Sequence, residues 1–217
     1  MSDVIITVRG EDEERRAPER ATLHLSVRAD APARDEVVRR VLARSETVRE
    51  RIAAASAAGS ILDWSSARLA VRVERPWGDG GVRLDPVHTV AVDFTATFAD
   101  AGDLSAWVSD ASALDDVEIG EVHWHLTAQT RAALERDVAA RAVGIAVARA
   151  KAYAEALGLH SVVPLEVADP GFLAPDGGPR PLRAMRATAF DAAEAAVSYR
   201  PDDIVVAAAV EARFAAR

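Results

Sequence analysis

The 217-residue sequence contains no cysteine. Disulfide bonds, thiolate catalysis and zinc sites built on cysteine are therefore excluded. No apolar run approaches the roughly 20 residues that a membrane-spanning helix needs, so we expect no membrane span. The opening stretch MSDVIITVRG lacks the basic and then apolar segments of a secretory signal, and we accordingly expect a cytoplasmic protein.

Recognised catalytic motifs are also missing. The sequence has no GxSxG elbow, no phosphate-binding P-loop and no GxGxxG fingerprint. The glycines at 78, 80 and 81 precede no helix, so they predict a hairpin turn instead of a phosphate site. The carboxylates show no spacing that brings two of them together across a cleft. We therefore expect no enzymatic activity and no cofactor.

The charge balance limits the partners. With 26 basic and 34 acidic residues the net charge is −8, which repels phosphate at long range and argues against nucleic acid as a partner. Half of the residues are hydrophobic and 28% are charged, a composition typical of a folded globular chain.

Residues 21–127 predict an α+β lobe with an antiparallel sheet. The order is strand (21–29), helix ending at Gly59, strand (69–73), strand (82–98), helix after Asp100 and strand (117–126). Alternation with a period of two marks the strands, and apolar spacings of three and four mark the helices. This strand-helix-strand-strand-helix-strand order is that of ferredoxin-like folds, in which both helices cover one face of the sheet.

Local signals refine that prediction. Val4 to Val8 reads as a short strand that ends at Gly10, and the charged EDEERR after it reads as a solvated turn or hairpin. Asp30 is expected to cap the first helix. Ile119 and Val122 are three residues apart, so on a regular strand they would face opposite sides of the sheet. For both to face the core, the strand needs a bulge or bend, which we predict near Gly120.

The remainder, 128–217, predicts a long helix, an irregular loop and two closing strands. The helix ends at Gly158, the strands are 162–167 and 204–214, and residues 169–203 form a loop rich in proline and glycine. The expected buried stripe of the helix has one charged member and is as follows: Leu134, Val138, Ala142, Ile145, Arg149 and Tyr153. We treat 1–217 as one domain made of these two lobes.

Several segments together resemble the SIMPL-domain family (DUF541), which includes bacterial periplasmic immunogens. They are IITVRG, ATLHLSVRA, VHWHLT, AVARAKAYAEALGL, PLRAMRA and PDDIVVAAAVEARF, spread over nearly the whole chain. The resemblance implies an α+β fold that self-assembles, in some members into large rings, and brings no established activity or catalytic residue. Many relatives are exported, whereas this sequence shows no export signal.

Three histidines form the most suggestive cluster. His24, His123 and His125 share the polar parity of two strands that are neighbours in the ferredoxin-like order. Three imidazoles on one open sheet face are a candidate metal site, with Glu121 as the obvious nearby carboxylate. Exposed histidines on a wet or oligomeric sheet face are commoner, so a structural or interface role is favoured.

Large apolar side chains on the 169–203 loop are the candidates for an interface, because they need a cover from their own domain or a neighbouring subunit. They are Phe172, Leu173, Leu182, Met185 and Phe190. The arginines of the first helix are interspersed with carboxylates at helical neighbour spacings, which predicts an ion-paired, solvated face.

Three functions remain open from the sequence. The favoured one is a non-enzymatic homo-oligomer with a scaffold or interaction role. The alternative is a protein that binds a metal or small molecule, or an enzyme, using the face of His24, His123 and His125. The third is a monomeric adaptor that docks a protein partner through residues 170–200.

Overall fold

The structure is a computed structural model that describes residues 4–78, 81, 83–173 and 199–217. Its elements are β1 (Val4–Arg16), β2 (Arg20–Ala31), α1 (Arg34–Ala57), β3 (Ile61–Ser66), β4 (Ala70–Glu74), β5 (Val87–Phe98), α2 (Ala101–Ala111), β6 (Val117–His125), α3 (Ala128–Ala156), β7 (Val162–Ala168) and β8 (Ile204–Ala216). The described residues divide into two compact units. The five-stranded unit holds residues 18–126 and 199–202, and the three-stranded unit holds the others.

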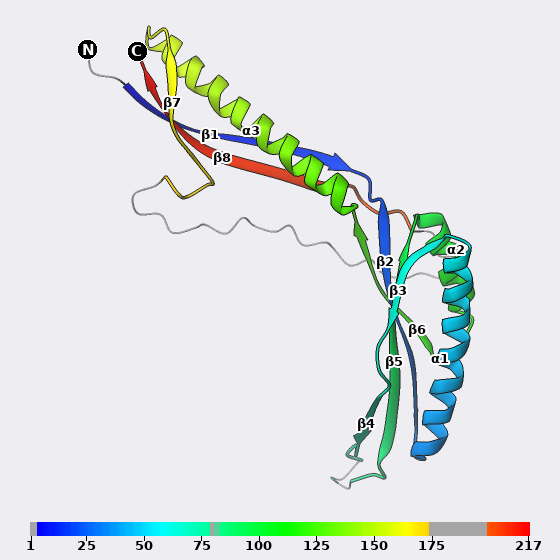
Figure 1. The fold of residues 1–217 in the computed structure, drawn as a ribbon. Coiled ribbons are helices and arrows are strands. Elements are labelled where there is room, and N and C mark those ends of the chain that lie inside the picture. The colour runs from blue at the N-terminus through cyan, green and yellow to red at the C-terminus, as the bar shows by residue number, and fades with distance from the viewer. Residues whose placement is uncertain (1–3, 79–80, 82, 174–198) are drawn as a thin grey trace. The chain divides into compact units, whose positions relative to one another are not determined.

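The five-stranded unit has the predicted α+β topology. Its antiparallel sheet has the order β3-β5-β2-β6, and β4 pairs with the first residues of β5, from Val87 to Ala91. Helices α1 and α2 cover one face of this sheet (Figure 1). The order of strands and crossovers is the ferredoxin-like one. The core between the layers is built from buried apolar residues, the largest of which are Phe94, Phe98, Leu23, Ile52, Ile61 and Leu104.

Two predicted strands have different bounds in the structure. The strand expected at 69–73 is β4, and it shares one edge of the sheet with β3. Both pair with β5, β3 with residues 94–98 and β4 with residues 87–91. The strand expected from Val82 begins at Val87, since the proline at 86 has no N–H to donate to a ladder.

The first helix is not capped as predicted. Asp30 belongs to β2, and the residue that precedes the helix is Ala33, which provides no side-chain cap. Acidic residues in the first turn, Asp35 and Glu36, complement the helix dipole in its place. The cap predicted at Asp100 is confirmed, because its carboxylate accepts hydrogen bonds from the N–H groups of Gly102 and Asp103.

The three-stranded unit is a sheet of order β1-β8-β7 with α3 packed on one face. The segment EDEERR is not a turn. It continues β1 to Arg16 and pairs with β8 residue by residue, from Glu11 opposite Ala209 to Arg16 opposite Ile204. Cross-strand pairing and ion pairs to α3 outweigh the low strand propensity of acidic residues in this stretch.

The buried stripe of α3 differs from the predicted one after Ala142. It continues through alanines at strict four-residue spacing, Ala146, Ala150 and Ala154, whereas Ile145 and Tyr153 are exposed. The reason is the close approach of the helix to β1. A side chain at Gly10 would overlap the carbonyl oxygen of Ala142 and lie 2.7 Å from the nitrogen of Ala146. Only small residues fit along this contact, and larger apolar residues are displaced to its flanks.

Candidate functional site

The histidine-bearing face is the side of the five-stranded sheet that the helices leave open. Along β2, Leu23 and Leu25 are buried while His24 between them is exposed. The register places His123 opposite Thr22 and His125 opposite Arg20, so all three histidines share this face. The parity prediction is therefore confirmed at the level of the backbone.

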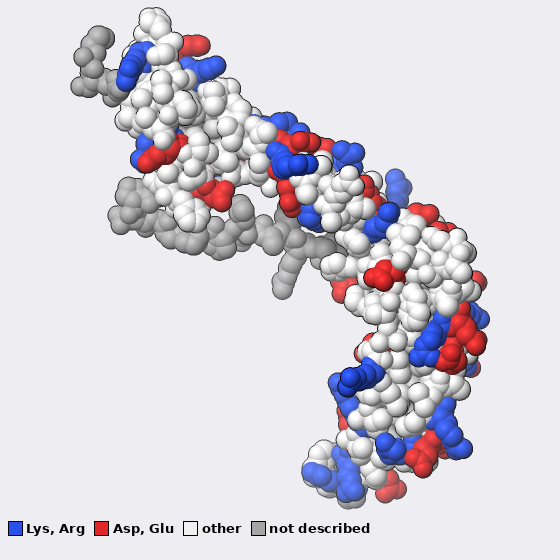
Figure 2. Space-filling model, in the orientation of Figure 1, with Lys and Arg blue, Asp and Glu red and all other residues white. Residues whose placement is uncertain are grey.

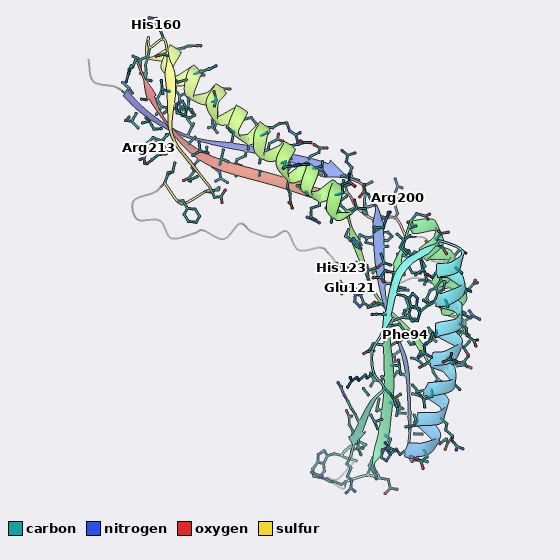
Figure 3. The ribbon with its side chains drawn as sticks, viewed as in Figure 1. Phe94, Glu121, His123, His160, Arg200 and Arg213 are labelled. Carbon is teal, nitrogen blue, oxygen red and sulfur yellow. The ribbon has the colours of Figure 1, made fainter. Side chains whose placement is uncertain are left out.

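The side chains of the three histidines have different surroundings. The Nε2 of His125 lies 3.0 Å from the Thr22 hydroxyl, which in turn lies 2.9 Å from the Thr97 hydroxyl. His123 is exposed and lies 4.0 Å from the carboxylate of Glu121, its neighbour on β6 (Figure 3). His24 lies where the register of β2 and β6 shifts. Within the described ranges, no three His, Asp or Glu side chains come together as a metal site would require.

The pairing of His125 with Thr22 places an imidazole beside a hydroxyl, which is the first requirement for an activated nucleophile. The second requirement, a group that orients the base, is poorly met. His125 Nδ1 is 3.4 Å from the backbone carbonyl of Leu126, its own neighbour in the chain. Thr22 also shares its hydroxyl with Thr97, so the arrangement is best described as a cross-strand polar network.

The predicted bulge at Gly120 shapes a hollow on this face. Leu23 pairs with Val122 and Leu25 with Ile119, so β6 carries one extra residue opposite His24. A side chain at Gly120 would come within 2.8 Å of the carbonyl oxygen of His24, which explains why glycine occupies this position. The hollow has a volume of about 480 Å³ and extends over residues of β3, β5, β2 and β6.

The floor of the hollow is polar. Ser26 lies between Asp93 on β5 and Glu118 on β6, and the Ser65 hydroxyl lies 2.8 Å from that of Thr95. Neither Asp93 nor Glu118 has a side-chain hydrogen bond or ion pair to another described residue. The hollow therefore offers two carboxylates, several hydroxyls and the His24 imidazole to a small polar ligand. Sequence reasoning named only His24 from this group, although the outward parity of the others was visible.

The predicted interface residues are only partly described. Phe172 is 74% exposed, and the carbonyl of Leu173 accepts a hydrogen bond of 3.3 Å from Arg213 on β8. Arg213, which is labelled in Figure 3, also pairs with Glu166 of β7 at 2.7 Å. Leu182, Met185 and Phe190 lie outside the described residues.

An apolar patch lies on the sheet face that carries Arg213. Ile5, Val163 and Leu165 are each about half exposed, and Ile5 pairs with Ala215, which in turn pairs with Val163. Ile5 and Leu165 border a shallow hollow together with Arg213. We call Ile5, Val163, Leu165 and Phe172 the apolar patch of the three-stranded unit. Sequence analysis missed its strand members because it assigned no outward face to these strands.

Ion pairs account for much of the remaining surface charge. Four of the six arginines of α1 have ion pairs, and acidic and basic residues intermix on this surface (Figure 2). Arg49 pairs at the predicted helical spacing, whereas Arg40 and Arg44 pair with carboxylates outside the helix. Arg40 bonds to Asp116, whose carboxylate raises the pKa of the guanidinium, and Arg49 bonds to Glu46. On α3, Arg141 bonds to Asp12 and Glu14 of β1. The hydrogen bond from Arg141 lowers the pKa of Glu14, and Arg16 adds to this effect.

Among the described residues, no helix is both long enough and apolar enough to cross a bilayer. Taken together, the fold defines an α+β protein with two antiparallel sheets, each with one helix-covered face. The chain matches the family model SIMPL, described as a protein of unknown function (DUF541), over residues 6–214. It therefore belongs to the SIMPL family. No curated protein matches it.

Proposed function

We propose that the protein is a non-enzymatic, self-associating chain that acts through assembly, and that the apolar patch of the three-stranded unit is its contact surface. The observation that carries this proposal is that Phe172 is 74% exposed. Its neighbour Leu173 accepts a hydrogen bond from Arg213, and Arg213 borders the same shallow hollow as Ile5 and Leu165. Exposed apolar clusters rimmed by polar groups are typical of protein interfaces.

The composition of this face supports a contact between copies. Its centre is apolar, and the ion pairs Arg213–Glu166 and Arg9–Glu11 supply charges of both signs. A face of this kind can meet a second copy without placing like charges opposite each other. A stable contact buries about 800 Å² per partner, more than these four side chains supply, so surrounding residues would contribute.

Absolute mass in solution tests the proposal. Light scattering behind size exclusion should give a discrete oligomer for the unaltered chain, and Phe172→Arg and Leu165→Arg should shift it to the monomer. Leu62→Arg is the matched control, because Leu62 is 50% exposed on a strand of the other unit. A monomer for the unaltered chain at all concentrations, or an oligomer that both patch variants retain, would refute the proposal.

A second candidate function is the binding of a small polar molecule in the hollow at His24. Its support is the polar floor, on which Asp93 and Glu118 have no described side-chain partner. Nuclear magnetic resonance with a library of small polar fragments should shift the amide signals of Ser26 and Gly120. Ser26→Leu should abolish these shifts by filling the hollow, and Thr89→Leu, farther along the same face, should leave them intact.

The metal alternative has a separate test. If the three histidines bind a metal, elemental analysis of purified protein will show zinc, copper or nickel in stoichiometric amount, lost in His123→Ala and retained in His160→Ala. His160 follows α3 in the other unit and is the appropriate control. A metal-free preparation removes this alternative and leaves the fragment experiment to decide whether the hollow binds an organic ligand.

A further inference from the structure

The described residues of the connection between β4 and β5, 75–78, 81 and 83–86, are called the tip here. Beyond the paired strands, Trp77 and Arg83 form an isolated antiparallel bridge, and the Leu84 N–H donates to the Pro76 carbonyl at 2.9 Å. The Leu84 side chain lies against Gly78, where an added Cβ would come within 2.9 Å of a Leu84 methyl group. The backbone thus presents Trp77 and Leu84 in a defined arrangement.

This tip is apolar and exposed. Trp77 is 65% exposed, and Val73 and Leu84 are about half exposed. The other three tryptophans of the chain, Trp64, Trp107 and Trp124, are partly buried against the core of the five-stranded unit. Tryptophan is therefore used for packing at three positions, and Trp77 has no comparable structural role.

Three arginines lie at or next to the tip, and one of them contacts Trp77. Arg83 lies over the Trp77 ring with its guanidinium carbon 4.7 Å from the ring centroid, a cation–π contact. Neither Arg83 nor the nearby Arg72 and Arg75 has an ion pair with a described residue, in contrast to Arg40 and Arg49 on α1. Figure 2 shows arginine side chains, with some acidic ones beside them, at the end of the unit where β4 lies.

We propose that this tip is a docking site for an acidic peptide segment of a protein partner. An apolar side chain of the peptide would pack on Trp77 and Leu84, and its carboxylates would pair with Arg72, Arg75 and Arg83. Tryptophan and arginine are the residues most enriched in binding hot spots. The guanidinium of Arg83 is already held over the Trp77 ring, so it loses less side-chain entropy when it binds a carboxylate.

An anionic membrane or a nucleic acid fits the tip less well. Both present dense phosphate, which a chain of net charge −8 repels at long range. Three acidic residues, Glu74, Asp79 and Asp85, also belong to this stretch of the sequence and would add to the repulsion of dense phosphate. A peptide carries only a few carboxylates and can place each of them at an arginine, away from these acidic residues. This site lies in the five-stranded unit and does not depend on the proposed assembly through the other unit.

Selection from a library of random twelve-residue peptides displayed on phage tests the proposal with the full chain as target. Enriched peptides should combine Asp or Glu with a large apolar residue. Their affinity should fall about tenfold or more in Trp77→Ala and in Arg83→Gln, and should weaken with salt. Arg39→Gln, an exposed arginine of α1, is the control and should bind as the unaltered chain does.

Two outcomes would overturn the proposal. One is the absence of enriched acidic peptides, or their equal binding to Trp77→Ala. The other is Trp77-dependent sedimentation with vesicles of phosphatidylserine and phosphatidylcholine while no peptide binds, which would assign the tip to a lipid surface.

Because the tip lies outside the core, circular dichroism spectra of both variants should match that of the unaltered chain. The light-scattering mass should also stay unchanged, which separates this test from that of assembly.

Discussion

Arg40 and Asp116 join α1 to the turn that precedes β6. The Arg40 Nε–H donates to one carboxylate oxygen of Asp116 at 2.6 Å, and the Nη2–H donates to the other. Asp116 adopts a left-handed backbone with φ of 63°, and its side chain is only 10% exposed. Its carbonyl also accepts the Arg28 N–H of β2 at 2.8 Å. One residue thus positions the start of β6 through both its backbone and its side chain.

Three substitutions separate these two roles of Asp116. Asp116→Gly removes the ion pair, but glycine adopts the left-handed backbone without strain. Asp116→Ala removes the ion pair and also strains the backbone, so its free energy of unfolding should be about 1 kcal/mol lower than that of Asp116→Gly. Arg40→Met should lower the urea midpoint of the unaltered chain and have no further effect in Asp116→Gly. Equal midpoints for Ala and Gly would show that the backbone conformation carries no cost.

Gly10 and Gly144 form a matched pair for testing the contact between β1 and α3. Gly10→Ala should reduce the free energy of unfolding by about 1–3 kcal/mol, because the added methyl group meets the backbone of α3. Gly144→Ala should increase it by about 0.5–1 kcal/mol, since nothing lies within 4 Å of the added carbon in the middle of the helix. Urea unfolding of both variants measures the difference. A stabilising Gly10→Ala would contradict the close approach.

The ion pairs of Arg141 predict a pH dependence. The hydrogen bond from Arg141 lowers the pKa of Glu14 below its ordinary value of 4.5 in the folded state. A lowered folded pKa adds stability above the unfolded value and loses it as the pH falls through the folded value. The thermal midpoint of the unaltered chain should therefore exceed that of Arg141→Gln at pH 7, and the gap should narrow below pH 4.5.

Arg149→Gln is the control for that experiment, because Arg149 donates to the carbonyl of Arg9 and pairs with no carboxylate. Its midpoint should differ from that of the unaltered chain by an amount that does not change between pH 7 and pH 4. A constant gap for Arg141→Gln as well would show that Glu14 does not carry the effect.

Much of the five-stranded unit was predictable because its signals are local. Alternation along β2 and β5, the Asp100 cap and the parity change at Gly120 each depend on a few neighbouring residues, and the structure confirms all of them. The charged end of β1 was not predictable in this way. Its partner is β8, nearly 200 residues away in the chain, and local composition carries no information about that pairing.

The candidate sites show the same division. Parity identified the face of His24, His123 and His125, but the hollow beside His24 also needs Asp93 of β5 and Glu118 of β6, which only the register brings together. In α3, bulky residues such as Ile145 appeared to define the buried stripe. The approach of Gly10, which reverses that choice, is a tertiary effect.

Tyr199 and Trp124 provide the last test, which concerns the segment that precedes β8. Their ring centroids lie 6.0 Å apart at an angle of 60°, and the Tyr199 N–H lies 3.3 Å from the Ser105 hydroxyl of α2. Burial raises the pKa of the Tyr199 phenol. A double-mutant cycle with Tyr199→Ala and Trp124→Ala, measured by urea unfolding, should give a coupling energy of about 1 kcal/mol. The control cycle combines Tyr199→Ala with Trp64→Ala.

Trp64 lies on β3, at the edge of the sheet opposite to β6, so the two effects in the control cycle should be additive. Additivity in both cycles would show that residues 199–202 do not pack on the five-stranded unit in solution.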